Sequence, residues 1–169
     1  MLISLGGLPA TGKTTLARVL APQLGAVHLR VDTIEQAIVR SGLATHPVGP
    51  AGYVIGYAQA EEHLRQGLTV IAESVNPLSV TRDAWRDTAT RAGTPVLEVE
   101  TICSDPVEHR RRATTRAVDI PGLRLPDWED ITGRAYEPWT RGHLVIDTAA
   151  HDIDACVTAL RRALERVGG

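Results

Sequence analysis

The segment Gly7-Leu-Pro-Ala-Thr-Gly-Lys-Thr14 matches the pattern G-x-x-x-x-G-K-[S/T] at every defined position. A short apolar segment, residues 2–5, precedes it and predicts a buried strand, whereas residues 14–24 carry apolar side chains at helical spacing. In a strand–loop–helix unit of this kind, backbone N–H groups and the helix N-terminus surround phosphate oxygens. The motif therefore predicts a nucleotide-binding loop and restricts the chain to folds built around such a unit.

Strand and helix patterns alternate along the rest of the chain. Further strands are expected at residues 26–31, 68–73, 95–102 and 144–147. Helices are expected at residues 32–39, 53–66, 80–92, from 105 onward, 128–136 and 153–167. This alternation predicts an α/β fold, a parallel five-stranded sheet with helices on both faces. We expect one domain, residues 1–169, with a short lid at about residues 117–140.

Composition narrows the class of protein. The chain has 169 residues, 43% of them apolar, which is ordinary for one ordered domain. The net charge of −2 argues against a dedicated binder of long nucleic acids, which usually carries a basic excess. Two cysteines suit a reducing compartment, and no apolar run is long enough to span a membrane. We therefore expect a cytoplasmic protein without a membrane partner.

Lysine is almost absent from the chain. Of the 18 basic residues, only Lys13 is a lysine, and it lies inside the glycine-rich motif. A general bias toward arginine explains the rest, and the exception suggests that arginine would not serve at this position. Lysine is a compact point charge, whereas arginine is a broad planar fork.

The motif assigns a role to each residue of the loop. Lys13 is expected to reach the β- and γ-phosphates of a nucleotide and to take part in catalysis, and the Thr14 hydroxyl is expected to bind Mg²⁺. The residues expected to bind the nucleotide are Gly7, Ala10, Thr11, Gly12, Lys13, Thr14 and Thr15. No N-K-x-D guanine motif is present, which favours ATP over GTP.

The segment Gly6-Gly-Leu-Pro-Ala-Thr-Gly-Lys-Thr-Thr-Leu-Ala17 resembles the loops of small P-loop kinases, in particular the group called AAA-type ATP-binding proteins. That group is similar to phage polynucleotide kinase, zeta toxins, chloramphenicol phosphotransferase, gluconate kinase and adenylylsulfate kinase. The order of the expected elements follows the same plan over essentially the whole chain. The resemblance implies a kinase that uses ATP and Mg²⁺, and it specifies the acceptor poorly.

Two acidic residues follow the second expected strand. Asp32 comes directly after it, where the carboxyl ends of parallel strands form a binding crevice. A carboxylate there can orient an acceptor hydroxyl and take its proton, and similar kinases carry an aspartate at this point. Asp32 is equally suited to cap a helix, and both roles are compatible. Glu35, one turn further, is a weaker candidate for a substrate contact.

The third expected strand ends in Glu73-Ser-Val-Asn76. In P-loop enzymes, an acid at the end of a strand beside the loop strand helps to hold Mg²⁺. Many similar proteins have Asp followed by Asn here. Because Glu73 is longer than Asp, metal binding and substrate binding both stay open for it, and Asn76 is a candidate substrate contact or the start of a turn.

Arginines gather before the expected lid. Arg112 and Arg116 are four residues apart, so a continuous helix would place them on one face. In similar kinases, this helix and the lid supply arginines to the phosphates, which makes both residues candidate catalytic groups. A solvated arginine-rich face is the alternative.

The leading hypothesis is a phosphotransferase that moves the γ-phosphoryl group of ATP to a hydroxyl of a small molecule, such as a nucleoside, sugar, antibiotic or other metabolite. A kinase of 5′-hydroxyl ends of nucleic acids is the second, which the net charge disfavours. The third, from another class, is an ATP-binding switch module without phosphotransfer. Asp32 and the arginines argue against it, because a switch needs no acceptor base.

Overall fold

Five parallel strands form the centre of the molecule, which we describe for residues 1–168 from a computed structural model. The strands run in the order β2-β3-β1-β4-β5. Their bounds are β1 (Leu2–Gly6), β2 (Val27–Arg30), β3 (Val70–Glu73), β4 (Val96–Ile102) and β5 (Leu144–Asp147). The predicted five-stranded parallel sheet is therefore confirmed.

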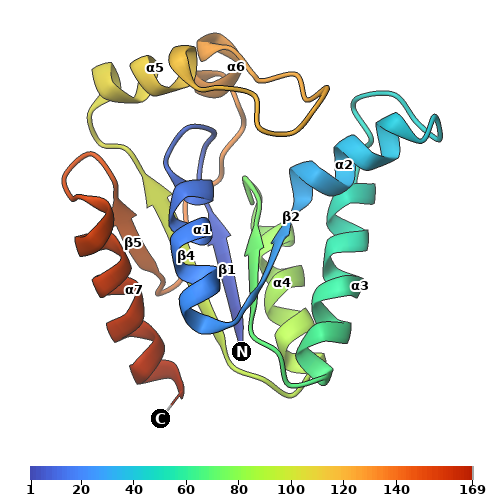
Figure 1. The fold of residues 1–169 in the computed structure, drawn as a ribbon, viewed down its shortest axis with the longest axis vertical. Helices are drawn as coiled ribbons and strands as arrows, with labels where there is room; N and C mark the ends of the chain where they lie inside the picture. The colour runs from blue at the N-terminus through green and yellow to red at the C-terminus, as the bar shows by residue number, and fades with distance from the viewer. Residues whose placement is uncertain (169) are drawn as a thin grey trace.

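Seven helices connect these strands within residues 1–168. Their bounds are α1 (Lys13–Leu24), α2 (Val31–Arg40), α3 (Ala51–Arg65), α4 (Ser79–Arg91), α5 (Pro106–Thr115), α6 (Trp128–Thr132) and α7 (Ile153–Gly168). Figure 1 shows α1 and α7 on one face of the sheet, with α3 and α4 on the other. The helices α5 and α6 lie beyond the carboxyl ends of the strands and cover the edge of the sheet (Figure 1).

Alternation of side chains along the strands explains the two covered faces. Successive residues of a strand point to opposite faces. In β1, Ile3 and Leu5 pack in one cluster with Leu16 of α1 and Leu160 of α7. Their neighbour Leu2 packs in a second cluster with residues of α3 and α4. Because both faces are buried, the strand reads as the nearly unbroken apolar run seen in the sequence.

Three element bounds differ from the sequence-based expectation. The third strand begins at Val70 rather than at residue 68, because Leu68 is exposed and follows a glycine with positive φ. The helix α3 begins at residue 51, directly after Pro50, rather than at 53. The helix α6 ends at Thr132 because Gly133 caps it, so the expected helical stretch up to residue 136 is wrong.

The strand order determines where a ligand can bind. In register, Glu73 of β3 is level with Leu5 of β1 on one side and with Arg30 of β2 on the other. The end of β1, where the glycine-rich loop begins, thus lies between the carboxyl ends of β3 and β4. In doubly wound sheets, this crevice is where ligands bind. Within residues 1–168, none of the helices combines the length and the apolar character needed to cross a membrane.

Candidate functional site

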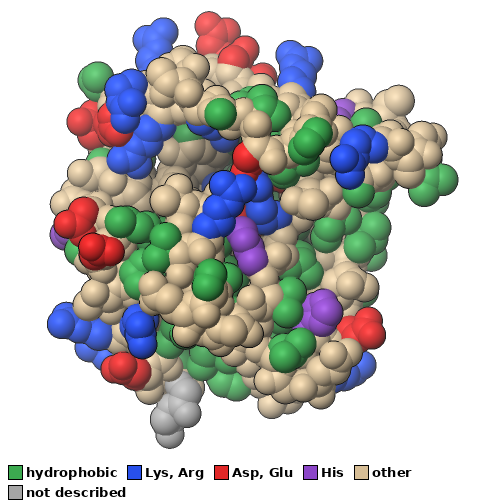
Figure 2. All heavy atoms as spheres, viewed as in Figure 1, with side chains coloured by type: hydrophobic (Ala, Val, Ile, Leu, Met, Phe, Trp, Pro, Cys, Tyr) green, Lys and Arg blue, Asp and Glu red, His purple; other side chains and the backbone are tan. Residues whose placement is uncertain are grey.

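One large cavity opens at the carboxyl ends of the strands, with a volume of about 1610 Å³. Its walls are the glycine-rich loop, the start of α2, the end of β3, the segment from Arg111 to Pro126 and the segment from Thr148 to Ile153. Figure 2 shows basic side chains gathered beside a hollow in the middle of one face of the molecule. The cavity brings together most of the residues singled out in the sequence, including those of the phosphate-binding motif.

Backbone geometry explains why the loop needs glycine. Gly7 has a φ of 137°, and a Cβ atom there would lie 2.2 Å from the carbonyl oxygen of Thr101. Gly12 has a φ of 94° at the start of α1. Ala10 also has a positive φ, of 65°, which is uncommon for a residue with a Cβ. The Thr11 hydroxyl lies 2.8 Å from the Thr101 hydroxyl, which fixes the loop to β4.

Lys13 is held inside this loop. Its Nζ atom donates hydrogen bonds of 2.7 Å to the carbonyl oxygens of Gly7 and Leu8, and only 7% of the residue is exposed. Burial lowers the pKa of Lys13 to about 8, although the nearby carboxylates Glu73 and Asp32 oppose that shift. The ammonium lies at the cavity floor and forms no direct ion pair with any of residues 1–168. It is therefore suited to bind phosphate oxygens.

Thr14 and Glu73 form the place where a metal ion would bind. The Thr14 hydroxyl donates a hydrogen bond of 2.5 Å to Oε1 of Glu73, which is 4% exposed. Burial alone would raise the pKa of Glu73, but hydrogen bonds from His28 and Thr14 and the charge of Lys13 outweigh it, so that the pKa is lowered. A hydroxyl beside an ionised carboxylate suits Mg²⁺, which takes few protein oxygens together with phosphate oxygens and water.

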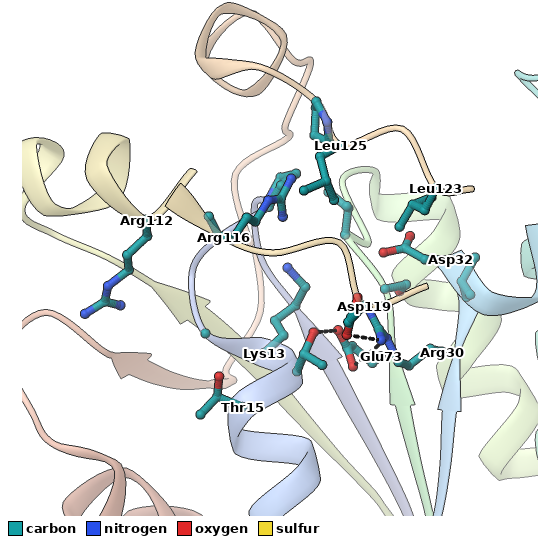
Figure 3. A pocket seen from close by; sticks show the side chains of 18 of the residues that line it. Lys13, Thr15, Arg30, Asp32, Glu73, Arg112, Arg116, Asp119, Leu123 and Leu125 are labelled. Atoms are coloured by element: carbon teal, nitrogen blue, oxygen red, sulfur yellow. Dashed lines mark hydrogen bonds and ion pairs between the residues drawn. The ribbon is translucent and has the colours of Figure 1, made fainter. Parts of the chain in front are cut away.

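Arg30 links Glu73 to Asp119, a contact that the sequence did not predict. Its Nε lies 3.4 Å from Oε2 of Glu73, and its Nη1 lies 2.8 Å from Oδ2 of Asp119. Arg18 of α1 reaches the same Asp119 oxygen at 2.6 Å. Figure 3 shows Asp119 above Glu73 and Arg30. The segment after α5 is therefore tied across the cavity to β2 and α1.

Asp32 and Glu35 line the half of the cavity opposite α5. Both lie on the first turns of α2, three residues apart, so they share a side of that helix. Burial and the charge of Asp32 raise the pKa of Glu35 to about 7, against the opposing charge of Arg134. The side chain of Glu35 lies over Gly52 of α3, where a Cβ atom would come within 2.3 Å of it.

Arg116 turns toward the phosphate-binding loop. Two of its guanidinium nitrogens, Nε and Nη2, are buried without a hydrogen-bond partner. Burial lowers its pKa despite the charges of Asp32 and Asp119. In Figure 3, its guanidinium lies on the same side of the cavity as the Lys13 ammonium. A buried cation with unused N–H donors is suited to an anionic ligand.

Arg112 occupies a different part of the cavity, so the expectation that it shares one helix face with Arg116 is corrected. Its guanidinium donates hydrogen bonds to Oγ1 and the carbonyl oxygen of Thr148 and forms an ion pair with Glu108. The helix α5 ends at Thr115, and Arg116 adopts an extended conformation with a ψ of 139°. The helical spacing of four residues therefore does not apply, and the two side chains diverge (Figure 3).

Asn76 does not reach the cavity, so the expected substrate contact at this residue is also corrected. It is fully buried, and its amide donates to the hydroxyl of Ser4 in β1. Its φ of 53° turns the chain after β3. Of the other loop residues, Thr15 lines the cavity and is exposed, whereas Thr11 is buried and serves the loop itself.

Comparisons with known proteins agree with this geometry. The profile of the AAA domain family matches residues 2–126. A probable adenylyl-sulfate kinase of Aeropyrum pernix is 27% identical over 99% of this chain and 93% of its own length. Two solved structures, a gluconokinase from Sinorhizobium meliloti and the APS kinase of Mycobacterium tuberculosis in complex with AMPPNP and APS, each superpose with a TM-score of 0.67.

These two structures are 18% and 17% identical to the chain, respectively. Each superposition covers 97% of this chain. It covers 91% of the gluconokinase and 96% of the APS kinase. At such identities the likeness shows the fold alone, and it extends over the whole length of the molecule. Because the family profile covers well over half of the sequence, including the phosphate-binding loop, the chain belongs to the AAA domain family and has the fold of the P-loop kinases.

Proposed function

We propose that the protein is an ATP- and Mg²⁺-dependent phosphotransferase whose acceptor is a hydroxyl group of a small molecule. One observation carries this proposal. The carboxylate of Asp32 lines the same cavity as the Lys13 ammonium and the unpartnered guanidinium of Arg116. A carboxylate that shares a cavity with two cations, neither of them in an ion pair within residues 1–168, suits transfer of a phosphoryl group to a hydroxyl.

The residues of the glycine-rich loop would hold the nucleotide phosphates. Backbone N–H groups at the start of α1 and the Lys13 ammonium would bind their oxygens. Thr14 and Glu73 would hold Mg²⁺, which supplies positive charge to the phosphates when bound. Thr148, with Arg112 bonded to it, lies beyond Gly12 at the far end of the loop, so we assign this region to the base of the nucleotide.

Asp32 would act on the acceptor. Its carboxylate accepts the hydrogen bond of the acceptor hydroxyl, orients that oxygen toward the γ-phosphate and takes the proton as the new oxygen–phosphorus bond forms and the bond from the γ-phosphorus to the departing ADP breaks. Arg116 donates its free N–H groups to the transferring group and stabilises the charge that develops there. The segment tied down by Asp119 covers the cavity and excludes water, which would otherwise compete as acceptor.

The test is ADP release with Mg²⁺ and ATP across a panel of nucleosides, sugars, aminoglycosides, other hydroxylated antibiotics and 5′-hydroxyl oligonucleotides. We expect one class to stimulate ADP release and Asp32→Asn to lower the stimulated rate by about 10²- to 10⁴-fold. Asp87→Asn, on the exposed side of α4, serves as the matched control and should leave the rate unchanged. ATP binding without stimulation by any acceptor, and without an effect of Asp32→Asn, would instead indicate a switch module.

A further inference from the structure

Ser74 carries a polar group that the proposed reaction does not use. It directly follows Glu73 at the end of β3, lines the cavity and is 4% exposed. Its hydroxyl is buried and makes no well-formed hydrogen bond with any of residues 1–168. A buried hydroxyl that makes no hydrogen bond costs free energy, which a ligand with a matching group would recover.

Tyr53 provides a second polar group at the same place. It lies on the first turn of α3 and also lines the cavity. Its phenol oxygen accepts a hydrogen bond of 2.9 Å from the backbone N–H of Asn76. That bond leaves the phenol proton available to another acceptor, and the Ser74 hydroxyl is close enough to Tyr53 to interact with it.

Glu35 of α2 is a third polar residue that lines the cavity with Ser74 and Tyr53. Its carboxylate makes no hydrogen bond or ion pair with the described residues, 1–168, and the side chain lies over Gly52, next to Tyr53 in the sequence. Glu35, Asp32 and Tyr53 line the same cavity, and the charges of both carboxylates raise the pKa of Tyr53. The acceptor half of the cavity thus offers two hydroxyls and a second carboxylate beside the proposed base.

The donors and acceptors of this group select a kind of ligand. The phenol of Tyr53 donates, the Glu35 carboxylate accepts, and the Ser74 hydroxyl can do either. A ligand hydroxyl can accept from Tyr53 and donate to Glu35 at once. When Glu35 is ionised, a carboxylate or phosphate has no proton to give it, and an ammonium has no lone pair for Tyr53, so each would leave one protein group unsatisfied.

Charge and shape at this end of the cavity point the same way. An anionic ligand here would face both Asp32 and Glu35. Of the arginines nearby, Arg30 pairs with Glu73 and Asp119, whereas Arg124 and Arg134 line the cavity and the charge of Arg134 acts on Glu35. Apolar residues also line the cavity: Val31, Pro47, Val48, Val75, Pro77, Leu123, Leu125 and Pro126.

Resting on the proposed function, we propose that Ser74, Tyr53 and Glu35 form an acceptor subsite that binds a second hydroxyl group, and that the acceptor is an uncharged compound with at least two hydroxyls and an apolar portion. In this arrangement Asp32 binds the acceptor hydroxyl that reacts, and the subsite binds a second hydroxyl of the same acceptor. Ser74 and Tyr53 are specificity-determining residues in this arrangement, because they touch the acceptor but not the transferred group.

The experiment compares acceptors and variants together. Uncharged polyhydroxy probes (uridine, sorbitol and chloramphenicol) are tested beside analogues that lack one hydroxyl, and beside the anionic acceptors gluconate and adenylyl sulfate. For the best uncharged acceptor, we expect Ser74→Ala and Tyr53→Phe to raise the KM by about 5- to 30-fold, as for a lost hydrogen bond. The KM for ATP should stay within about twofold of the wild-type value.

A thermodynamic cycle makes the assignment specific. Removing the second hydroxyl from the acceptor should cost the wild type about as much as Ser74→Ala costs with the intact acceptor, and the two losses should not add. Tyr57→Phe is the matched control, because the Tyr57 hydroxyl donates to the carbonyl oxygen of Thr81 and its ring packs on Trp85 away from the cavity. It should leave the KM for the acceptor unchanged.

Each contrary result has a definite meaning. Turnover confined to anionic acceptors, additive losses in the cycle, or an equal effect of Tyr57→Phe would overturn the subsite and leave the kinase proposal standing. Absence of turnover with every acceptor, while Mg²⁺ and ATP still bind, would count against both.

Discussion

Single residues determine how the glycine-rich loop works, and Lys13 does so most directly. Its Nζ reaches the carbonyl oxygens of Gly7 and Leu8 at 2.7 Å, inside a loop where a Cβ at Gly7 would already collide with Thr101. A guanidinium is too broad for this space and cannot shed its proton. The structure therefore explains why a chain with 18 basic residues retains lysine at this one position.

Lys13→Arg should keep the charge and lose the function. We expect the rate of stimulated ADP release to fall by about 10²- to 10³-fold, as when one aligned donor is removed from a charge-stabilising site. Isothermal titration with a non-hydrolysable ATP analogue should show weakened binding as well. Activity of the Lys13→Arg variant within about threefold of the wild type would contradict the proposed role.

Glu35 gives a prediction about pH and stability. Burial and the charge of Asp32 raise its pKa from 4.5 to about 7, so the folded protein binds this proton more tightly than the unfolded chain does. The contribution of Glu35 to the free energy of unfolding therefore decreases as the pH rises from about 4.5 to about 7. Glu35→Gln stays uncharged and should gain stability relative to the wild type over that interval.

Thermal unfolding of the two proteins at pH 5 and pH 8 measures this effect. The difference in Tm, variant minus wild type, should be more positive at pH 8. Glu129→Gln, at an exposed position in α6, is the control and should show no such change with pH. If the difference in Tm for Glu35→Gln is the same at both pH values, the surroundings of Glu35 do not raise its pKa.

At the scale of elements, the segment after α5 is the part that the sequence described least well. The sequence predicted a lid at about residues 117–140, and the structure has an irregular segment between α5 and α6. The segment is attached through hydrogen bonds from Arg30 and Arg18 to Asp119. These arginines lie about 90 to 100 positions from Asp119 in the sequence and meet it only in the folded chain. Local sequence patterns carry no information about such distant contacts. Local spacing also did not show that α5 ends before Arg116, so Arg112 and Arg116 were wrongly placed on one helix face.

Asp119→Ala should release this segment. We expect faster backbone hydrogen exchange in residues 117–126, because the ion pairs that tie the segment to β2 and α1 are lost. Mass spectrometry of the exchanged protein resolves the effect by peptide. Asp87→Ala, on α4, should leave the exchange of these residues as in the wild type, and an equal rate in Asp119→Ala would show that the tether does not hold the segment.

For the elements themselves, local sequence was a good guide. The apolar strands and the motif at the start of α1 each predicted a feature within a few residues of its place. The candidate residues Lys13, Thr14, Asp32 and Glu73 also came together in one cavity. Ser74 was missed, and of the two alternatives left open for Asn76 the structure has the turn, with a φ of 53°, rather than a contact with the cavity.

At the scale of the whole molecule, the parallel sheet brings Thr14 of α1 and Glu73 of β3 to one point although they are far apart in the chain. If this point holds Mg²⁺ together with ATP, binding should stabilise the entire domain. At a concentration 100 times the Kd, the gain is about 2.7 kcal/mol, which corresponds to a rise in Tm of roughly 5 to 10 °C for a domain of this size.

The metal dependence of this rise is the measurement. ATP with Mg²⁺ should raise the Tm more than ATP with EDTA does, and Thr14→Ala should remove most of the difference. Thr90→Ala, on the exposed side of α4, is the control and should retain it. A rise in Tm that is equally large with EDTA would exclude Thr14 and Glu73 as a metal site that matters for nucleotide binding.

The single lysine also has a practical consequence for chemical labelling. Among the side chains of these 169 residues, only Lys13 offers a primary amine, and its pKa of about 8 leaves much of it unprotonated under mildly alkaline conditions. An acylating reagent that enters the cavity would therefore mark the glycine-rich loop as its one side-chain site, in addition to the α-amine of Met1. Protection of the Lys13 amine by a bound nucleotide would report occupancy directly, and immobilisation chemistry aimed at surface lysines would find none to use.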